Sequence, residues 1–284
     1  MHFQWYPGHM TKAKRMMQEN IKLVDLVIEL TDARVPLASR NPDIDELGKN
    51  KARLILLNKA DLAEDRYNDL WIEYFRKKGF MAVKVNSQKG TGIKSIQDVI
   101  REACKEKIER DRKRGILNRP VRAMVVGIPN VGKSTFINSL AGKACAKTGN
   151  KPGVTKGKQW IRLNKNVELL DTPGILWPKF EDQEVGLKLA WIGSIRDEIL
   201  QTEELTAELI GFLKEAYPGV LERVYHEEMP EDRYECLKAI AKSRHCLASG
   251  GEPDCEKAAR LCLEDFRNGK LGRITLEFPE EGDA

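Results

Sequence analysis

The chain of 284 residues lacks the features that mark membrane-bound, exported and disulfide-stabilised proteins. No apolar run approaches the roughly 18 residues that a membrane-spanning helix requires. The first residues lack the basic-then-apolar layout of a signal peptide. The six cysteines are scattered without a C-x-x-C pair, as in proteins whose thiols stay reduced. Together these absences predict a cytoplasmic protein with no membrane partner.

Internal repeats and low-complexity segments are also missing, which argues against solenoid and disordered architectures. Charged residues make up 32% of the chain and hydrophobic residues 41%, as in folded globular proteins. The length suits one large domain or two moderate ones. The net charge of +5 favours an acidic partner such as RNA.

Four short apolar runs precede polar motif residues, at 26–30, 54–57, 124–126 and 167–170. Helical patterns alternate with them, over about 11–24, 64–78, 93–114 and 133–141. Short buried strands that deliver loops at their C-terminal ends are typical of open parallel α/β sheets. The sequence therefore predicts an α/β domain over residues 1–178, with a mostly parallel sheet and flanking helices.

After about residue 180 the strand pattern stops and apolar residues recur at helical spacing. We predict a smaller, all-helical domain over residues 179–284. Lys238 and Lys242 share a helical face there, which suits binding to an RNA backbone. Acids such as Glu235 are interleaved with the cations, so an ordinary solvated face is the alternative.

Residues 127–134 match the phosphate-loop pattern G-x-x-x-x-G-K-[ST], between an apolar run and a helical pattern. In such loops, successive backbone N–H groups and a helix N-terminus face the phosphates. We expect Lys133 to reach the β- and γ-phosphates and the Ser134 hydroxyl to coordinate Mg²⁺. The expected nucleotide contacts of this loop are Asn130, Val131, Gly132, Lys133, Ser134 and Thr135.

A second phosphate element, residues 171–174, fits the D-x-x-G pattern of GTPases. Asp171 is expected to hold the Mg²⁺ shell through water, and the Gly174 N–H to meet the γ-phosphate. Thr155, in a P-G-V-T segment, is the candidate switch threonine that completes Mg²⁺ coordination and supports catalysis. Short segments of this composition are common, so an ordinary turn is the alternative for Thr155.

Residues 58–61 match the N-K-x-D motif that reads guanine. The Asp61 carboxylate can accept from both donors on guanine's N1–H and N2–H₂ edge, a pair that adenine lacks, so GTP is favoured over ATP. Asn58 can bond the base or the neighbouring loop, and the Lys59 stem can pack along the ring. The expected base contacts are Asn58, Lys59, Asp61, Asn86 and Ser87, the last two from a second base-edge loop.

The order of these motifs is unusual. In Ras-like GTPases the guanine motif follows both phosphate elements, whereas here it precedes them. This order predicts a circularly permuted domain, which is tolerated because domain ends tend to lie close together. The original ends would be joined by the helix over 93–114 and the turn at 118–120, and the new cut would follow Gly174.

Many GTPases carry a water-orienting glutamine after D-x-x-G, but this chain has Ile175, which cannot polarise water. His9 is the candidate catalytic residue instead, because the permutation brings residues 1–20 near the cut and a neutral imidazole can orient water. The alternative is a histidine that satisfies a loop or contacts RNA. The Asn130 amide oxygen can coordinate K⁺ beside the phosphates or merely hold the loop.

With these residues the chain resembles the circularly permuted ribosome-assembly GTPases over essentially its full length. The resemblance rests on the helical tail and on motifs at 5–10, 32–36, 58–61, 127–134, 152–155 and 171–174. It implies late maturation of the large ribosomal subunit and stimulation of turnover by the ribosome. It also implies catalysis by His9 and a K⁺ site at Asn130.

The predicted function is therefore GTP hydrolysis by an assembly factor that binds rRNA and the large ribosomal subunit. Lys133, His9 and Thr155 are the catalytic candidates, Mg²⁺ and K⁺ the cofactors, and GTP and GDP the ligands. We expect a monomer. The alternatives are an RNA-binding scaffold that holds GTP with little turnover, and a signalling switch that acts on a protein effector.

Overall fold

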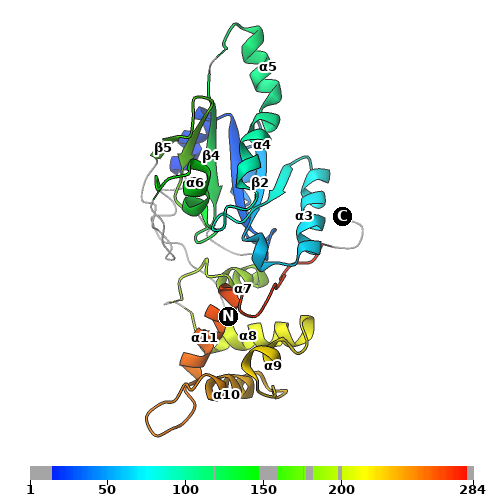
Figure 1. Ribbon diagram of the computed structural model, residues 1–284, viewed down its shortest axis with the longest axis vertical. Helices are drawn as coiled ribbons and strands as arrows, with labels where there is room; N and C mark the ends of the chain where they lie inside the picture. The colour runs from blue at the N-terminus through cyan, green and yellow to red at the C-terminus, as the bar shows by residue number, and fades with distance from the viewer. Residues whose placement is uncertain are drawn as a thin grey trace. The chain divides into compact units, whose positions relative to one another are not determined.

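The computed structural model describes residues 15–117, 119–146, 159–174, 176, 182–197 and 200–279 (Figure 1). The chain divides into two structural units, residues 1–183 with 275–284 and residues 184–274. This division differs from the expected domains 1–178 and 179–284 mainly at the C-terminal end, where the chain returns to the first unit. The helical spacing of apolar residues does not predict that return, because the return depends on hydrogen bonds to loops far away in the sequence.

The first unit is built on a six-stranded sheet in the order β3-β2-β1-β4-β6-β5 (Figure 1). The strands are β1 (Leu26–Asp32), β2 (Ala52–Asn58), β3 (Met81–Lys84), β4 (Val121–Gly127), β5 (Gln159–Arg162) and β6 (Val167–Asp171). Every neighbouring pair is parallel except β5 and β6. The predicted α/β fold is confirmed, and the parallel strands deliver their motifs to one edge of the sheet.

The helices of this unit lie between the strands in sequence. Residues 15–20 are helical and lie in the helix expected over 11–24. They are followed by η1 (Ile21–Leu23), α2 (Asp43–Leu47), η2 (Ala60–Leu62), α3 (Asp65–Lys77), η3 (Ile93–Ser95), α4 (Ile96–Ala103), α5 (Lys105–Lys113) and α6 (Lys133–Ala141). The helix expected over 93–114 is divided at Cys104 into α4 and α5. The two halves pack differently: α4 buries Ile96 and Ile100, whereas α5 is a charged helix that buries Asp111.

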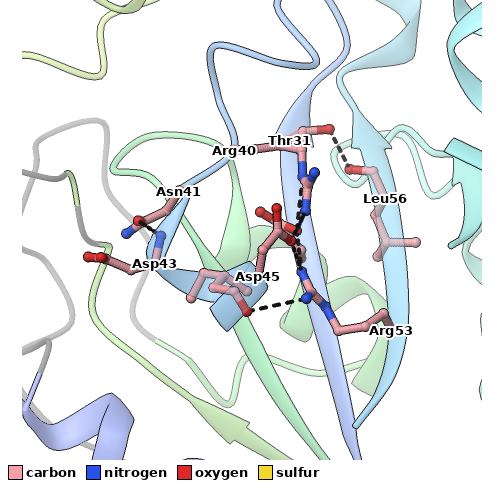
Figure 2. A network of polar contacts seen from close by, with 9 residues as sticks. Thr31, Arg40, Asn41, Asp43, Asp45, Arg53 and Leu56 are labelled. Carbon is pink, nitrogen blue, oxygen red and sulfur yellow. Dashed lines mark hydrogen bonds and ion pairs between the residues drawn. The ribbon is translucent and has the colours of Figure 1, made fainter. Parts of the chain in front are cut away.

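A buried ion cluster lies on the central strand β1. The Glu29 carboxylate is 1% exposed and accepts from Nη2 of Arg40 and of Arg53, both at 3.0 Å. Asp45 of α2 contacts the same two guanidinium groups (Figure 2). Arg40 also lies over the Phe80 ring, 4.9 Å from its centroid. The crossover between β1 and β2 is therefore fixed on the sheet by charge and aromatic contacts as well as by apolar packing.

The second unit is helical, as predicted. Its helices are α7, which begins in the first unit (Gln183–Trp191), α8 (Thr202–Ala216), α9 (Val220–Tyr225), α10 (Arg233–Ser243) and α11 (Cys255–Arg267). The carboxylates of Asp232 and Asp254 cap α10 and α11 by accepting from backbone N–H groups of the first turn. Helices α8, α10 and α11 bury Leu209, Leu237 and Phe266 at the core.

Inside this unit, Asp265 is buried and accepts from Arg244 Nη2 at 2.6 Å and from Tyr225 OH at 3.2 Å. Lys270 Nζ donates to its other oxygen at 2.7 Å. The network satisfies a buried carboxylate with three donors. Across both units, the helices that the structure describes include none long and apolar enough to cross a membrane.

Candidate nucleotide-binding site

The phosphate loop connects β4 to α6 and depends on an unusual backbone. Asn130 and Gly132 have φ values of 59° and 99°, in the left-handed region. A Cβ on Gly132 would lie 2.4 Å from Nδ2 of Asn58, which is closer than any real contact. Only glycine therefore lets the phosphate loop and the guanine loop approach each other at this point.

Lys133 begins α6 with its side chain inside the loop. It is 7% exposed, and its Nζ donates to the carbonyl oxygens of Gly127 and Ile128, both at 3.2 Å. Burial lowers the pKa of Lys133 to about 8, and the negative charge of Asp171 opposes that change. These carbonyls hold the ammonium inside the loop, whose backbone N–H groups are the ones that bind a phosphate.

The D-x-x-G segment lies directly against the phosphate loop. Asp171 is buried at the end of β6, paired in register with Val125 of β4. The Thr172 hydroxyl donates to the Val125 carbonyl at 2.7 Å. A Cβ on Gly174 would lie 2.8 Å from Pro129 N and 3.0 Å from Lys133 Nζ, so only a glycine fits there.

A magnesium ion would fit this arrangement. Mg²⁺ in nucleotide sites is held by one or two protein oxygens, waters and the phosphates themselves, not by a full protein cage. Ser134 in the first turn of α6 and Asp171 at the end of β6 would hold it, and when bound it neutralises charge on the β- and γ-phosphate oxygens.

Asn58 joins the loops of the site. Its side chain is buried, and Nδ2 donates to the Val131 carbonyl at 2.8 Å. Its Oδ1 accepts from the Ser87 N–H at 3.1 Å and from the Ser87 hydroxyl at 2.7 Å. Of the two roles considered for Asn58, the geometry supports the one in which it fixes the neighbouring loops.

The second base-edge loop is shaped by Asn86, whose Oδ1 accepts from the N–H groups of Gln88 and Lys89 at 3.0 and 2.9 Å. Asp61 remains partly open to solvent: its side chain is 31% exposed, and one oxygen lies 3.2 Å from Lys89 Nζ. A carboxylate at this position can still receive a ligand's donors. The structure thus brings Asn58, Asp61, Asn86 and Ser87 to one end of the site.

Two charged residues of the 32–36 motif, to which the sequence assigned no role, are part of the same site. Arg34 and Asp32 are both buried, and Arg34 donates from Nε and Nη2 to the two Asp32 oxygens at 2.9 and 2.8 Å. Asp32 Oδ2 also lies 3.0 Å from Nζ of Lys59. Burial alone would raise the pKa of Asp32, but the charges of Arg34 and Lys59 outweigh it and hold that pKa well below its usual range. The sequence signal that could have identified these two residues was a pair of opposite charges directly after an apolar strand.

Comparison with known proteins identifies the family. Residues 122–230 match the family model of the 50S ribosome-binding GTPase. The chain is 52% identical over 282 residues to ribosome biogenesis GTPase A of Bacillus cereus, an alignment that covers 99% of this chain and 95% of the relative. It is 48% identical to the Priestia megaterium protein of the same name, over 100% and 99% of the two chains. The chain belongs to the ribosome biogenesis GTPase A family.

A solved structure agrees with this membership. The crystal structure of GNP-bound YlqF from T. maritima matches with a TM-score of 0.67 and 31% identity, over 95% of this chain and 99% of that one. Members of the ribosome biogenesis GTPase A family are GTPases, so the predicted resemblance, the permuted fold and the GTP-hydrolysing activity are confirmed. The expected residues His9, Thr155 and Ile175 lie outside the described part of the chain, and their roles stay predictions.

Proposed function

We propose that this chain couples GTP hydrolysis to late maturation of the large ribosomal subunit, by binding the immature particle and its rRNA. The observation that carries this proposal is a site with both guanine-reading and phosphate-binding elements in a chain that matches ribosome biogenesis GTPases A from end to end. In this proposal the protein acts as a monomer in the cytoplasm, and the particle stimulates its turnover.

The proposed chemistry assigns one task to each group. Lys133 stabilises the charge that develops on the β- and γ-phosphates, and Thr155 completes the Mg²⁺ shell. His9 orients the attacking water, since the residue after D-x-x-G is Ile175, a hydrocarbon. Asn130 supports K⁺ binding through its amide oxygen, and the added positive charge stabilises the transition state.

Charge distribution guides how the RNA contact is proposed. Residues 184–274 contain 13 Lys or Arg and 18 Asp or Glu, a net charge of −5, whereas the rest of the chain contains 35 and 25, a net charge of +10. Lys238 and Lys242 lie 2.6 and 3.4 Å from carboxylate oxygens of Glu235 and Glu227. In this proposal the helical unit therefore binds the particle through a few specific contacts. The positively charged first unit supplies the general electrostatic attraction to rRNA.

The test is the rate of GTP hydrolysis with and without purified large subunits, in K⁺ and in Na⁺. We expect a slow intrinsic rate that rises with the particles, and more so in K⁺. Particles that bind the protein without changing the rate would support the scaffold alternative. Equal rates in the two salts would remove the cation from the mechanism and leave the rest of the proposal in place.

A further inference from the structure

The residues that follow the helical unit run along the first unit, beside α3 (Figure 1). We call residues 275–278 the strap. Thr275 and Leu276 are buried, and the Glu277 carbonyl accepts from the indole N–H of Trp71 at 3.0 Å. The Phe278 ring packs edge-on against Tyr67, with centroids 4.9 Å apart. The strap is thus an ordered part of the first unit.

The strap is bonded to the loop that follows β1. The Leu276 N–H donates to the Arg34 carbonyl at 2.9 Å. The Glu277 carboxylate accepts from the backbone N–H groups of Leu37 and Ala38, at 2.7 and 3.0 Å. A carboxylate that accepts from two successive N–H groups fixes a loop more firmly than a neutral acceptor does.

A second contact joins the strap to the segment after the guanine motif. Thr275 Oγ1 accepts from the Glu64 N–H at 3.2 Å. Glu64 precedes α3 and follows Asp61 by three residues. The strap is therefore bonded to two segments near the guanine-reading loop, the Arg34 loop that follows β1 and Glu64, which follows the motif.

The Arg34 contact continues to a base-reading residue. Arg34 holds Asp32 with two parallel hydrogen bonds, and Asp32 holds the Lys59 ammonium. Lys59 has a φ of 58°, a left-handed conformation that a residue with a side chain keeps only when its surroundings impose it. The contacts that run from Leu276 through Arg34 and Asp32 to Lys59 supply such surroundings, and Glu277 anchors the strap beside them at Leu37 and Ala38.

We propose that the strap is a positioning element for guanine recognition, which holds Lys59 and Asp61 in the geometry that binds the base. This inference rests on the proposed guanine site. Because the guanine loop contacts the base and not the γ-phosphate, loosening the strap weakens GTP and GDP by the same factor. The rate of hydrolysis at saturating GTP stays as in the wild type.

The test uses the full-length chain with Glu277→Gln, which keeps the shape of the side chain and removes its charge. Dissociation rates of fluorescent GDP and of a non-hydrolysable GTP analogue should both rise by about 5- to 10-fold, because a neutral amide oxygen holds the Leu37 and Ala38 N–H groups less firmly than the carboxylate does. The matched control is Glu168→Gln, which removes a carboxylate 3.1 Å from Arg122, between strands β4 and β6. The control should leave both rates unchanged.

A double-mutant cycle tests the route of the effect. If Glu277 acts through Lys59, adding Glu277→Gln to Lys59→Met should change the equilibrium nucleotide affinity far less than it does in the wild type. Equal effects in both backgrounds would overturn the route. Unchanged dissociation rates with a lowered free energy of unfolding would make the strap merely structural and overturn the inference. Failure of the wild type to bind guanine nucleotides would instead overturn the proposed function.

Discussion

The two ends of the nucleotide site are held in different ways. At the base end, side chains hold the loops: Asn58 bonds two neighbouring loops and Asp32 holds Lys59. At the phosphate end, the backbone does so, through the left-handed Gly132 and the carbonyls around Lys133. Isosteric side-chain changes at the base end should therefore alter which base is bound. At the phosphate end, the addition of a single Cβ should abolish most of the nucleotide affinity.

The strongest test of this contrast is Gly132→Ala. The added Cβ would meet the Asn58 amide at 2.4 Å in a conformation that alanine avoids, so GTP and GDP affinity should fall by roughly 100-fold. Calorimetric titration measures the loss. Gly142→Ala is the control, because Gly142 has a similar left-handed φ of 65° at the other end of α6 but has nothing within 4 Å of a Cβ. Wild-type affinity in Gly132→Ala would contradict the contrast.

His9→Ala tests whether the rate of hydrolysis can be changed without changing nucleotide binding at either end of the site. Removing a group that orients water should lower kcat by roughly 100-fold while GTP affinity and binding to the large subunit stay nearly intact. Single-turnover hydrolysis on saturating particles isolates the chemical step. His2→Ala is the control. A wild-type rate for His9→Ala would leave His9 with a structural or RNA-contacting role.

Asp61→Asn tests whether the base end is adjustable. The amide can no longer accept from both guanine donors, so GTP affinity should fall by about 10- to 100-fold. Xanthosine triphosphate, whose 2-oxo group suits an amide donor, should bind the variant better than it binds the wild type. Parallel titrations of the two nucleotides decide this. If GTP affinity did not change, Asp61 would not be a base contact.

A smaller effect concerns pH at the phosphate end. With a pKa of about 8, against an ordinary 10.5, Lys133 disfavours the folded state while protonated, and this penalty fades as the pH rises through 8. Nucleotide binding needs the protonated form of Lys133. Above pH 8 the binding of nucleotide should therefore be accompanied by uptake of a proton, and the affinity should fall by up to about tenfold per pH unit. Calorimetry in two buffers of different ionisation enthalpy counts the protons. Lys133→Arg, which stays charged, should show no uptake in this range.

The sequence predicted those parts of the site that depend on local patterns. An apolar run followed by a motif was sufficient to identify the ends of β2, β4 and β6, because parallel strands bring such ends together. The pairing of Asp32 with Lys59 could not be predicted, since it joins two strands through side chains and no spacing rule covers it. The short edge strand β5 and the break at Cys104 were missed for the related reason that tertiary packing decides them.

The position of the strap makes the helical unit an insertion, not an appendage. The chain enters residues 184–274 from the first unit and returns to it, so the two units are joined by two covalent crossings. A truncation near residue 180 would remove the strap together with the helices, and would mix a loss of docking with a loss of nucleotide affinity. The informative deletion is an internal one, in which a flexible linker replaces 184–274 and the native C-terminal residues remain.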